Sequence, residues 1–136
     1  MKKNNNLIID TSVYITYARN GKLYRMYNAI AFYELYVFVN DNLLLEFERN
    51  MADSKIYTAI ELTIILNALK DITIHFDTIS LFQNSPDTKD NFLFDLAIQT
   101  ESKVIVTKEK ALLNFKDSPV AIHDIKWFKE TYPVEL

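Results

Sequence analysis

The chain alternates short, β-branched apolar runs with longer segments of helical periodicity, and this alternation constrains its fold more than any other feature. The apolar runs have the length and composition of buried strands and occur at residues 7–9, 36–39, 72–76, 104–106 and 120–122. Helices are expected directly after Asp10 and at residues 22–34, 41–50, 54–70, 91–100, 110–115 and 125–131. This order predicts a three-layer α/β fold, in which a parallel β-sheet is flanked by helices on both faces.

The start of several helices and the burial of one can also be predicted. Short polar side chains that cap helices stand before three of the segments: Thr11 or Ser12, Asn40 or Asp41, and Asp90. Segment 54–70 is apolar over most of its circumference, so we expect this helix to be buried.

Composition limits the class of protein. The 136 residues correspond to one domain, residues 1–136, and 49% of them are hydrophobic, which is ample for a core. The chain has no cysteine, and its two histidines, His75 and His123, are expected to have structural roles beside strands, so a typical zinc site is not expected. The net charge of -3 argues against a broad positive surface that coats nucleic acid. No apolar run approaches the roughly 20 residues of a membrane span, and no signal peptide is recognisable, so a cytoplasmic protein without membrane contact is expected.

Four acidic residues stand where α/β sheets form their sites. Asp10 ends the first predicted strand, and Glu109 follows the strand at 104–106. Asp90 precedes a predicted helix, and Glu46 lies one turn inside the helix after the second strand. Because sites in such sheets form beyond the carboxyl ends of the strands, these acids are expected to converge at one edge.

Crowded carboxylates repel one another, so a cluster of this kind needs a cation. Ligand sets made only of oxygen select hard ions such as Mg²⁺ or Mn²⁺. Ions held in this way suit phosphodiester hydrolysis, because they activate the attacking water and neutralise charge on the phosphate and the leaving oxygen. The four acids therefore predict metal-dependent phosphodiester chemistry.

Each acid also has a structural alternative. Asp10 and Asp90 would serve as ordinary helix caps, and Glu46 is acceptable as a solvated helix residue. Glu109 lies in a mixed patch of charged residues, whose lysines, including Lys108, could contact phosphates.

A phospho-receiver domain shares the α/β layout and the acids at strand ends. Asp53 and Lys108 stand near the positions expected for its phosphoacceptor and its lysine. However, Asp53 follows a helical segment rather than a strand, and Thr11 and Ser12 stand where the second acid of a pair would be. These departures argue against that class.

Tyrosines recur at helical spacing, at Tyr14 and Tyr17 and again at Tyr24 and Tyr27. Such rings can stack on nucleic-acid bases, but stripes of this kind are more commonly buried in a core or an interface. Surplus apolar surface would suit a homodimer or a groove for a partner helix.

Four runs contain the acids and follow one another in a specific order. They are Ile8–Val13 (Ile-Ile-Asp-Thr-Ser-Val), Asn42–Phe47 (Asn-Leu-Leu-Leu-Glu-Phe), Asp87–Ala97 (Asp-Thr-Lys-Asp-Asn-Phe-Leu-Phe-Asp-Leu-Ala) and Val104–Leu113 (Val-Ile-Val-Thr-Lys-Glu-Lys-Ala-Leu-Leu). In the order and spacing of these motifs, the chain resembles a PIN domain from residue 7 to residue 113. The nearest likeness is to the PIN toxins of bacterial toxin–antitoxin pairs.

The resemblance implies an RNA endonuclease that uses Mg²⁺ or Mn²⁺, forms a homodimer and is inhibited by an antitoxin protein. Matched motif by motif, the catalytic, metal-binding acids it implies are Asp10, Glu46, Asp90 and Glu109. The supporting residues it implies around them are Ser12, Asp87, Asp95 and Thr107.

The fourth motif departs from the usual family pattern Val-Thr-Gly-Asp. Lys108 replaces the glycine, and Glu109, one methylene longer, replaces the aspartate. Altered metal distances would weaken the enzyme, so a catalytically weakened or inactive PIN-like module that binds nucleic acid or protein is the alternative. Binding of Mn²⁺ at the four acids would distinguish the enzyme from such a module.

Overall fold

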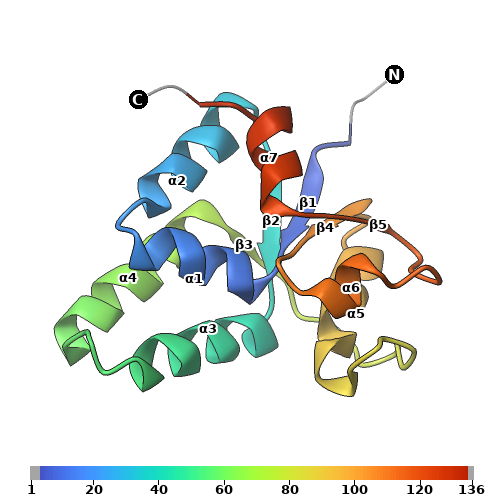
Figure 1. Ribbon diagram of the computed structural model, residues 1–136, viewed down its shortest axis with the longest axis horizontal. Coiled ribbons are helices and arrows are strands. Elements are labelled where there is room, and N and C mark those ends of the chain that lie inside the picture. The colour runs from blue at the N-terminus through green and yellow to red at the C-terminus, as the bar shows by residue number, and fades with distance from the viewer. Residues whose placement is uncertain (1–3, 135–136) are drawn as a thin grey trace.

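The computed structural model describes residues 4–134, and its strands and helices alternate as expected (Figure 1). The strands are β1 (Asn6–Ile9), β2 (Tyr36–Val39), β3 (Ile74–His75), β4 (Val104–Val106) and β5 (Ala121–His123). The helices are α1 (Thr11–Arg19), α2 (Leu23–Phe32), α3 (Asp41–Asp53), α4 (Ala59–Ile72), α5 (Asn91–Gln99), α6 (Lys110–Leu113) and α7 (Ile125–Thr131), with a short 3₁₀ helix η1 (Thr88–Asp90) before α5.

The five strands are all parallel and lie in the order β3-β2-β1-β4-β5. From β1 the chain moves outward through β2 to β3, and it then crosses to β4 and β5 on the other side of β1. The reversal between β1 and β4 is a topological switch point, where α/β sheets open a crevice beyond the carboxyl ends of their strands. A binding site is therefore expected among the residues that follow β1 and β4.

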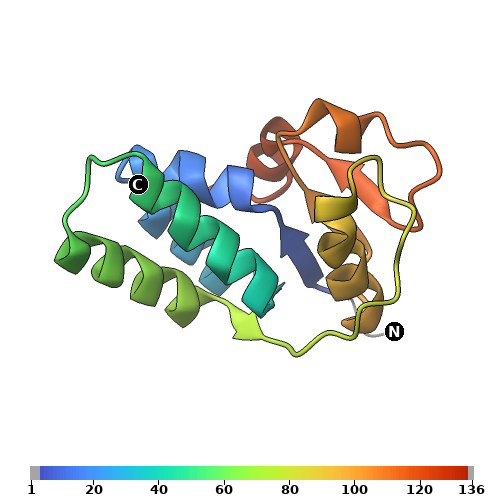
Figure 2. The ribbon, with the colours of Figure 1, turned by 90° about the horizontal axis from the view of Figure 1, so that it is seen from below.

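The helices cover both faces of the sheet, as predicted. Because crossovers between parallel strands are right-handed, the reversal of direction at β1 sends later helices to the opposite face. Figure 2 shows α1 to α4 on one side of β1 and α5 on the other. The predicted α/β fold with a parallel sheet between helices is confirmed.

The two central strands are buried on both faces. Ile8 and Ile9 of β1 and Ile105 and Val106 of β4 have no exposed surface, which explains why these strands are continuous apolar runs. Residues 9 and 106 are partners across the β1–β4 pair. The residues at the switch point therefore follow directly from strands that are packed on both faces.

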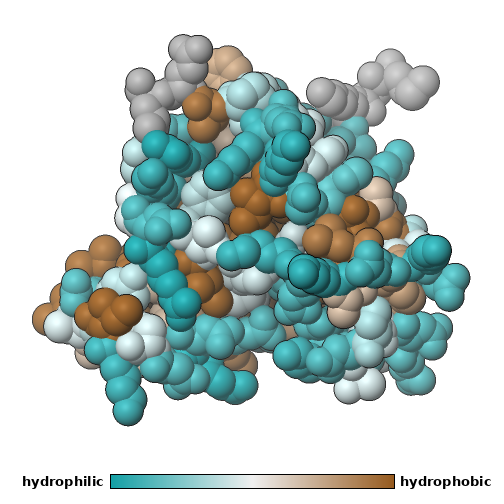
Figure 3. Space-filling model, in the orientation of Figure 1, coloured by the Kyte–Doolittle hydropathy of each residue, from teal (hydrophilic) through white to brown (hydrophobic). Residues whose placement is uncertain are grey.

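Helix α4 differs most from its predicted position. A capping box, in which Thr58 and Glu61 bond each other's backbone N–H groups, makes it begin at Ala59 rather than at residue 54. The predicted burial is wrong, because Ile60 and Ile64 are 74% and 62% exposed and only Leu69 is buried. The helix packs against α2 and α3, which leaves its opposite side uncovered. Figure 3 shows hydrophobic surface at the lower left, over the end of α4.

Strand β3 is shorter than predicted, with two residues in place of five, and both are exposed at the edge of the sheet. Helix α3 continues to Asp53, three residues beyond its predicted end. Within residues 4–134, none of the helices has the length and apolar character needed to cross a membrane.

Candidate metal centre

Four acidic side chains come to the carboxyl edge of the sheet from four different elements. Asp10 directly follows β1, and Glu109 stands just before α6, which follows β4. Asp90 is the last residue of η1, and Glu46 lies in the second turn of α3. Each therefore projects from a short connection or a helix next to the switch point between β1 and β4.

Asp10 is a buried carboxylate with one satisfied oxygen and one free oxygen. The residue is 1% exposed. Its Oδ2 accepts hydrogen bonds from Thr107 Oγ1 at 2.8 Å and from Ser12 Oγ at 3.1 Å. Its Oδ1 is buried and has no hydrogen-bond partner among residues 4–134. A buried oxygen of this kind is costly unless a proton or a cation satisfies it.

The structural alternative for Asp10 fails on geometry. Asp10 occupies the N-cap position of α1, but no side chain makes a capping bond there, so the expectation that Thr11 or Ser12 caps this helix is wrong. The Ser12 hydroxyl donates to the Asp10 carboxylate instead. Helix capping therefore does not explain Asp10.

Two hydroxyl groups tie Asp10 to the turn after β4. Thr107 Oγ1 donates to Asp10 and accepts from the backbone N–H of Glu109 at 3.0 Å. Ser12 Oγ donates to Asp10 and accepts from the backbone N–H of Lys108 at 3.2 Å. This pair of links fixes the Asp10 carboxylate and the turn that carries Glu109 relative to each other.

Asp90 repeats the pattern of Asp10. It is 1% exposed, and its Oδ1 is buried without a partner among the described residues. It stands at the N-cap position of α5, as predicted, but its side chain makes no capping bond, so that expected role is wrong as well. Two buried carboxylates, each with an unpartnered oxygen, thus lie at one edge of the sheet.

The pKa values show that the acids interact electrostatically. Burial, and then the charges of Glu109 and Glu46, raise the pKa of Asp10 to about 6 against the hydrogen bonds from Thr107 and Ser12. Burial and the adjacent Glu109 carboxyl hold the pKa of Asp90 well above its usual range. Burial also raises the pKa of Glu46, which Glu109 raises further. Each of these groups binds a proton more readily in the folded protein than in the unfolded chain, and a bound divalent cation would relieve the same repulsion.

The donor set fits a hard cation. It consists of carboxylate oxygens with no sulfur and no imidazole, and two of the carboxylates keep a free oxygen. Mg²⁺ and Mn²⁺ prefer such ligands. Asp10 and Asp90 are the firmest candidates, and Glu46 and Glu109, both half-buried, complete the set.

The four carboxylates do not crowd around a single point. Within residues 4–134, no three of them bring ligand atoms within 4.8 Å of one another. Mg²⁺ usually keeps several waters and takes only one or two protein carboxylates, and paired ions stand about 3.5–4 Å apart. The spacing therefore fits a hydrated ion or a pair of ions better than one ion enclosed by protein.

A groove of ≈ 680 Å³ opens beside the acids, between α1 and α3. It is lined by Ser12, Ile15, Thr16, Arg19, Asn20, Glu46, Arg49, Asn50, Lys89, Lys108 and Glu109. Hollows of ≈ 830 Å³ and ≈ 790 Å³ lie elsewhere on the protein, but none of the four acids lines either of them. The groove is thus the concave surface through which a substrate could reach the acids.

The family model of the PIN domain matches residues 6–111, which include all four acids. The chain belongs to the PIN domain family. PIN domains are generally metal-dependent nucleases, in agreement with an oxygen-only cluster at the switch point. Comparison with curated proteins and with solved structures gave no match. The phospho-receiver alternative does not hold, because Asp53 ends helix α3 and follows no strand.

The fourth PIN motif keeps its contacts despite its altered residues. The backbone N–H groups of Lys108 and Glu109 still bond the hydroxyls of Ser12 and Thr107. The Lys108 side chain turns to α1, where Nζ donates to Thr16 Oγ1 at 2.8 Å. Neither substitution therefore disturbs the hydrogen bonds of Asp10.

Two of the predicted supporting residues contact loop backbone instead of the acids. Asp87 accepts from the backbone N–H of Lys89 and so caps η1. Asp95 is buried in α5 and accepts from the backbone N–H groups of Leu81 and Phe82 at 3.0 and 2.8 Å. Asp95 thereby holds the long loop before η1, which positions Asp90 only indirectly.

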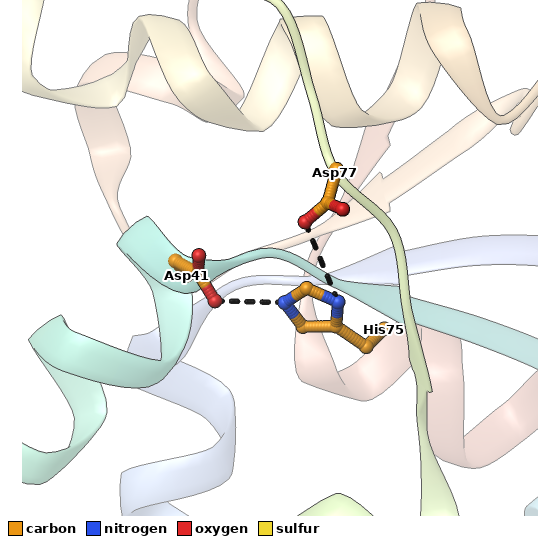
Figure 4. A group of neighbouring side chains, drawn as sticks. All are labelled: Asp41, His75 and Asp77. Atoms are coloured by element: carbon orange, nitrogen blue, oxygen red, sulfur yellow. Dashed lines mark hydrogen bonds and ion pairs between the residues drawn. The ribbon is translucent and has the colours of Figure 1, made fainter.

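A second group of ligand-type side chains lies at the edge of the sheet, away from β1. His75 stands between two carboxylates, with Nε2 at 2.7 Å from Asp41 Oδ1 and Nδ1 at 3.7 Å from Asp77 Oδ1 (Figure 4). The side chains of these residues are 45% (His75), 79% (Asp41) and 90% (Asp77) exposed. We call this group the edge triad. No linear pattern predicts this group, because it depends on the pairing of β2 with β3, which sets Val39 beside His75.

The remaining aromatic predictions divide between core and surface. Tyr14 and Tyr17 are buried, so they do not stack on bases, whereas Tyr24 and Tyr27 are about half exposed on α2. His123 stacks on Trp127, with ring centroids 4.2 Å apart, which agrees with its expected structural role.

Proposed function

We propose that this PIN domain is an Mg²⁺- or Mn²⁺-dependent endoribonuclease that hydrolyses phosphodiester bonds of RNA. The observation that carries the proposal is the pair of buried carboxylates, Asp10 and Asp90, each with an oxygen that lacks a partner among residues 4–134. Asp10, Glu46, Asp90 and Glu109 would hold the ion. When bound, such an ion would activate the attacking water and neutralise charge on the phosphate and the leaving oxygen.

The protein's own residues would orient this chemistry. Thr107 and Ser12 engage one oxygen of Asp10, so the other is held toward the cation. Glu46 and Glu109 line both the acid cluster and the groove, and they would therefore lie between the ion and the RNA.

RNA cleavage by the purified protein tests the proposal. We expect single-stranded RNA to be cleaved with Mn²⁺ or Mg²⁺, EDTA to stop the reaction, and Asp10→Asn to abolish it. His75→Gln is the matched control, because it alters the edge triad and leaves the four acids untouched. Activity that survives exhaustive chelation would rule out the metal mechanism.

The altered fourth motif supports one other candidate, a PIN-like module that binds nucleic acid or protein without cleaving RNA. Lys108 brings a cation to the border of the acids, and Glu109 has a longer reach than aspartate. Mn²⁺ distinguishes the two: the enzyme should be stabilised by the ion through its acids, whereas the inactive module should not.

For the biological role, we propose the toxin of a toxin–antitoxin pair, acting in the cytoplasm on cellular RNA. The resemblance of the four motifs to PIN toxins supports this role. Exposed apolar side chains, among them Ile60 and Ile64 on α4, supply surface for a homodimer or an antitoxin helix. A dimer at micromolar concentration by light scattering, and an adjacent gene for a small DNA-binding protein, are the expected findings; a monomer would count against the homodimer.

A further inference from the structure

We propose that Arg19, Arg49 and Lys108 form a phosphate-binding track that holds single-stranded RNA along the groove between α1 and α3. The inference rests on the proposed function, since it names the path of the substrate to the acids. It assigns binding roles to three residues that none of the four PIN motifs requires to be basic.

Basic side chains gather in one groove although the protein as a whole is acidic. The chain carries a net charge of -3, yet Arg19, Arg49 and Lys108 all line the same groove. None of the three forms an ion pair with an acid of residues 4–134. Lys89, by contrast, forms an ion pair with Asp87, in which Nζ lies 3.8 Å from Oδ2. Arg19, Arg49 and Lys108 form no such pair, and with Lys89 they outnumber Glu46 and Glu109 in the lining. The groove is therefore net positive and offers a site for an anion.

The three cations come from separate elements and extend away from the acids. Lys108 stands in the turn before Glu109, Arg49 is one helical turn beyond Glu46 in α3, and Arg19 ends α1. The Lys108 ammonium is held over α1 by its bond to Thr16 Oγ1. The basic groups therefore continue from the metal-binding end of the groove along both of its walls.

The length of the groove exceeds a single phosphate. Its lining along α1 runs from Ser12 to the C-cap residue Asn20, which corresponds to on the order of 12 Å along the helix axis. Asn20 and Asn50 add side-chain amides, one on each wall, that can donate to phosphate oxygens. A run of phosphates, rather than a free anion, matches this arrangement.

The width and lining of the groove favour a single strand held by its backbone. α1 and α3 pack against each other with their axes about 8–10 Å apart, so the groove is a furrow over their contact that is narrower than a nucleic-acid duplex. None of the described residues that line the groove is aromatic, and Tyr14 and Tyr17 of α1 are buried, so bases have no stacking platform there. We therefore expect contacts to phosphate that are independent of base sequence.

Binding of a fluorescent oligouridine tests the track. The measurement uses the Asp10→Asn background, so that the RNA stays intact. The groove variant replaces Arg19, Arg49 and Lys108 with glutamine. The control variant replaces Lys70, Lys116 and Lys126 with glutamine, which changes the net charge equally at exposed positions outside the groove.

The groove variant should bind the oligonucleotide at least about tenfold more weakly, and the control should bind like its parent. Loss of three phosphate contacts to a single strand should also reduce the slope of log K against log salt by about 2. An equal loss in both variants, or a loss in neither, overturns the track. So does equal binding of duplex RNA, or equally effective competition by polyglutamate, because the groove would then not select a single-stranded nucleic acid.

The same variants separate the track from the proposed function. If the parent with Asp10 intact cleaves RNA and the groove variant binds and cleaves normally, the track is wrong and the nuclease assignment stands. If no preparation cleaves RNA in Mn²⁺ but the groove variant loses binding, the track stands and the nuclease assignment fails.

Discussion

Two groups of acidic side chains lie at the carboxyl edge of the same sheet, and they differ in burial and in compactness. Asp10 and Asp90 are buried, and each has an oxygen without a partner among residues 4–134. The edge triad of Asp41, His75 and Asp77 is more compact, since its ligand atoms lie within 4.8 Å of one another, but it is open to solvent. In the edge triad, Asp41 is within hydrogen-bond distance of His75, and both carboxylates are open to solvent.

The comparison teaches that burial, rather than compactness, separates these clusters. An exposed carboxylate loses little when no cation is bound, because water solvates it. A buried one must find a proton, a hydrogen-bond donor or a metal ion. The raised pKa of Asp10 expresses this demand, and its cause is chiefly burial.

The largest effect should come from removing one buried acid. Asp10→Asn should reduce RNA cleavage at least about a hundredfold, because loss of a residue that merely supports a metal ligand already costs 10–100-fold. The stabilisation of the protein by Mn²⁺ in a thermal melt should also disappear. His75→Gln should change neither quantity. If His75→Gln abolishes the Mn²⁺ shift and Asp10→Asn preserves it, the edge triad is the metal site and the comparison is reversed.

A smaller loss is expected from the hydroxyl that orients Asp10. Thr107→Val keeps the side-chain shape but removes the donor to Asp10 Oδ2, so Mn²⁺ affinity should fall roughly tenfold to a hundredfold. The affinity for RNA in the absence of metal should stay the same, which separates positioning of the ligand from general damage.

Thr100→Val is the matched control for that substitution. Thr100 is also buried, and its hydroxyl bonds the Leu96 carbonyl and Ser102, away from the acids. It should reduce stability without lowering Mn²⁺ affinity. Equal Mn²⁺ affinities for the Thr107→Val protein and the wild type would remove Thr107 from the site.

The stability of the metal-free protein should depend on pH through the buried acids. The pKa of Asp10 rises from 3.8 to about 6 on folding, so between these values the folded protein binds more protons than the unfolded chain. The free energy of unfolding should therefore fall as the pH rises through this window, and the part of the loss that is due to Asp10 should be complete above it. A shift of about 2 units corresponds to roughly 3 kcal/mol at most. Asp90, whose pKa is also raised by burial and by Glu109, should extend the loss to higher pH.

Urea unfolding at several pH values, in the presence of EDTA, measures this dependence. Asp10→Asn should make the curve less steep between pH 4 and 6, where the slope that remains comes from Asp90, and the variant should be more stable than the wild type at pH 7. Asp41→Asn, which removes an exposed acid of the edge triad, should follow the wild type. If the curve for Asp10→Asn matches that of the wild type, Asp10 is not the source of the pH dependence.

The smallest effect should come from the fourth motif. Glu109→Asp restores the usual family residue but leaves the backbone bonds of the turn unchanged, since these involve main-chain N–H groups. We expect its Mn²⁺ affinity, measured by calorimetry, to change by less than about tenfold. A larger gain would mean that the longer glutamate weakens the centre, as the sequence pattern suggested.

Much of the fold could be predicted from the sequence because its signals are local. Apolar runs such as Ile8–Ile9 and Ile105–Val106 identify strands buried on both faces, and Asn40 caps α3 as expected. Helix α4 was misjudged for the same reason. Its apolar circumference is a local property, whereas its burial depends on how much of that surface α2 and α3 cover.

The sequence by itself determined the alternation of elements, the family and the identity of the four acids, because these depend on residue type and spacing along the chain. Tertiary structure decided the hydrogen bonds and the burial of those acids. Only the pairing of β1 with β4 brings Thr107 to Asp10, and only packing buries an oxygen of Asp10 and of Asp90 without a partner among the described residues. Asp95, which shares a sequence motif with Asp90, holds a loop instead. Solvation and hydrogen bonding are set by neighbours in space, and a linear pattern does not contain those neighbours.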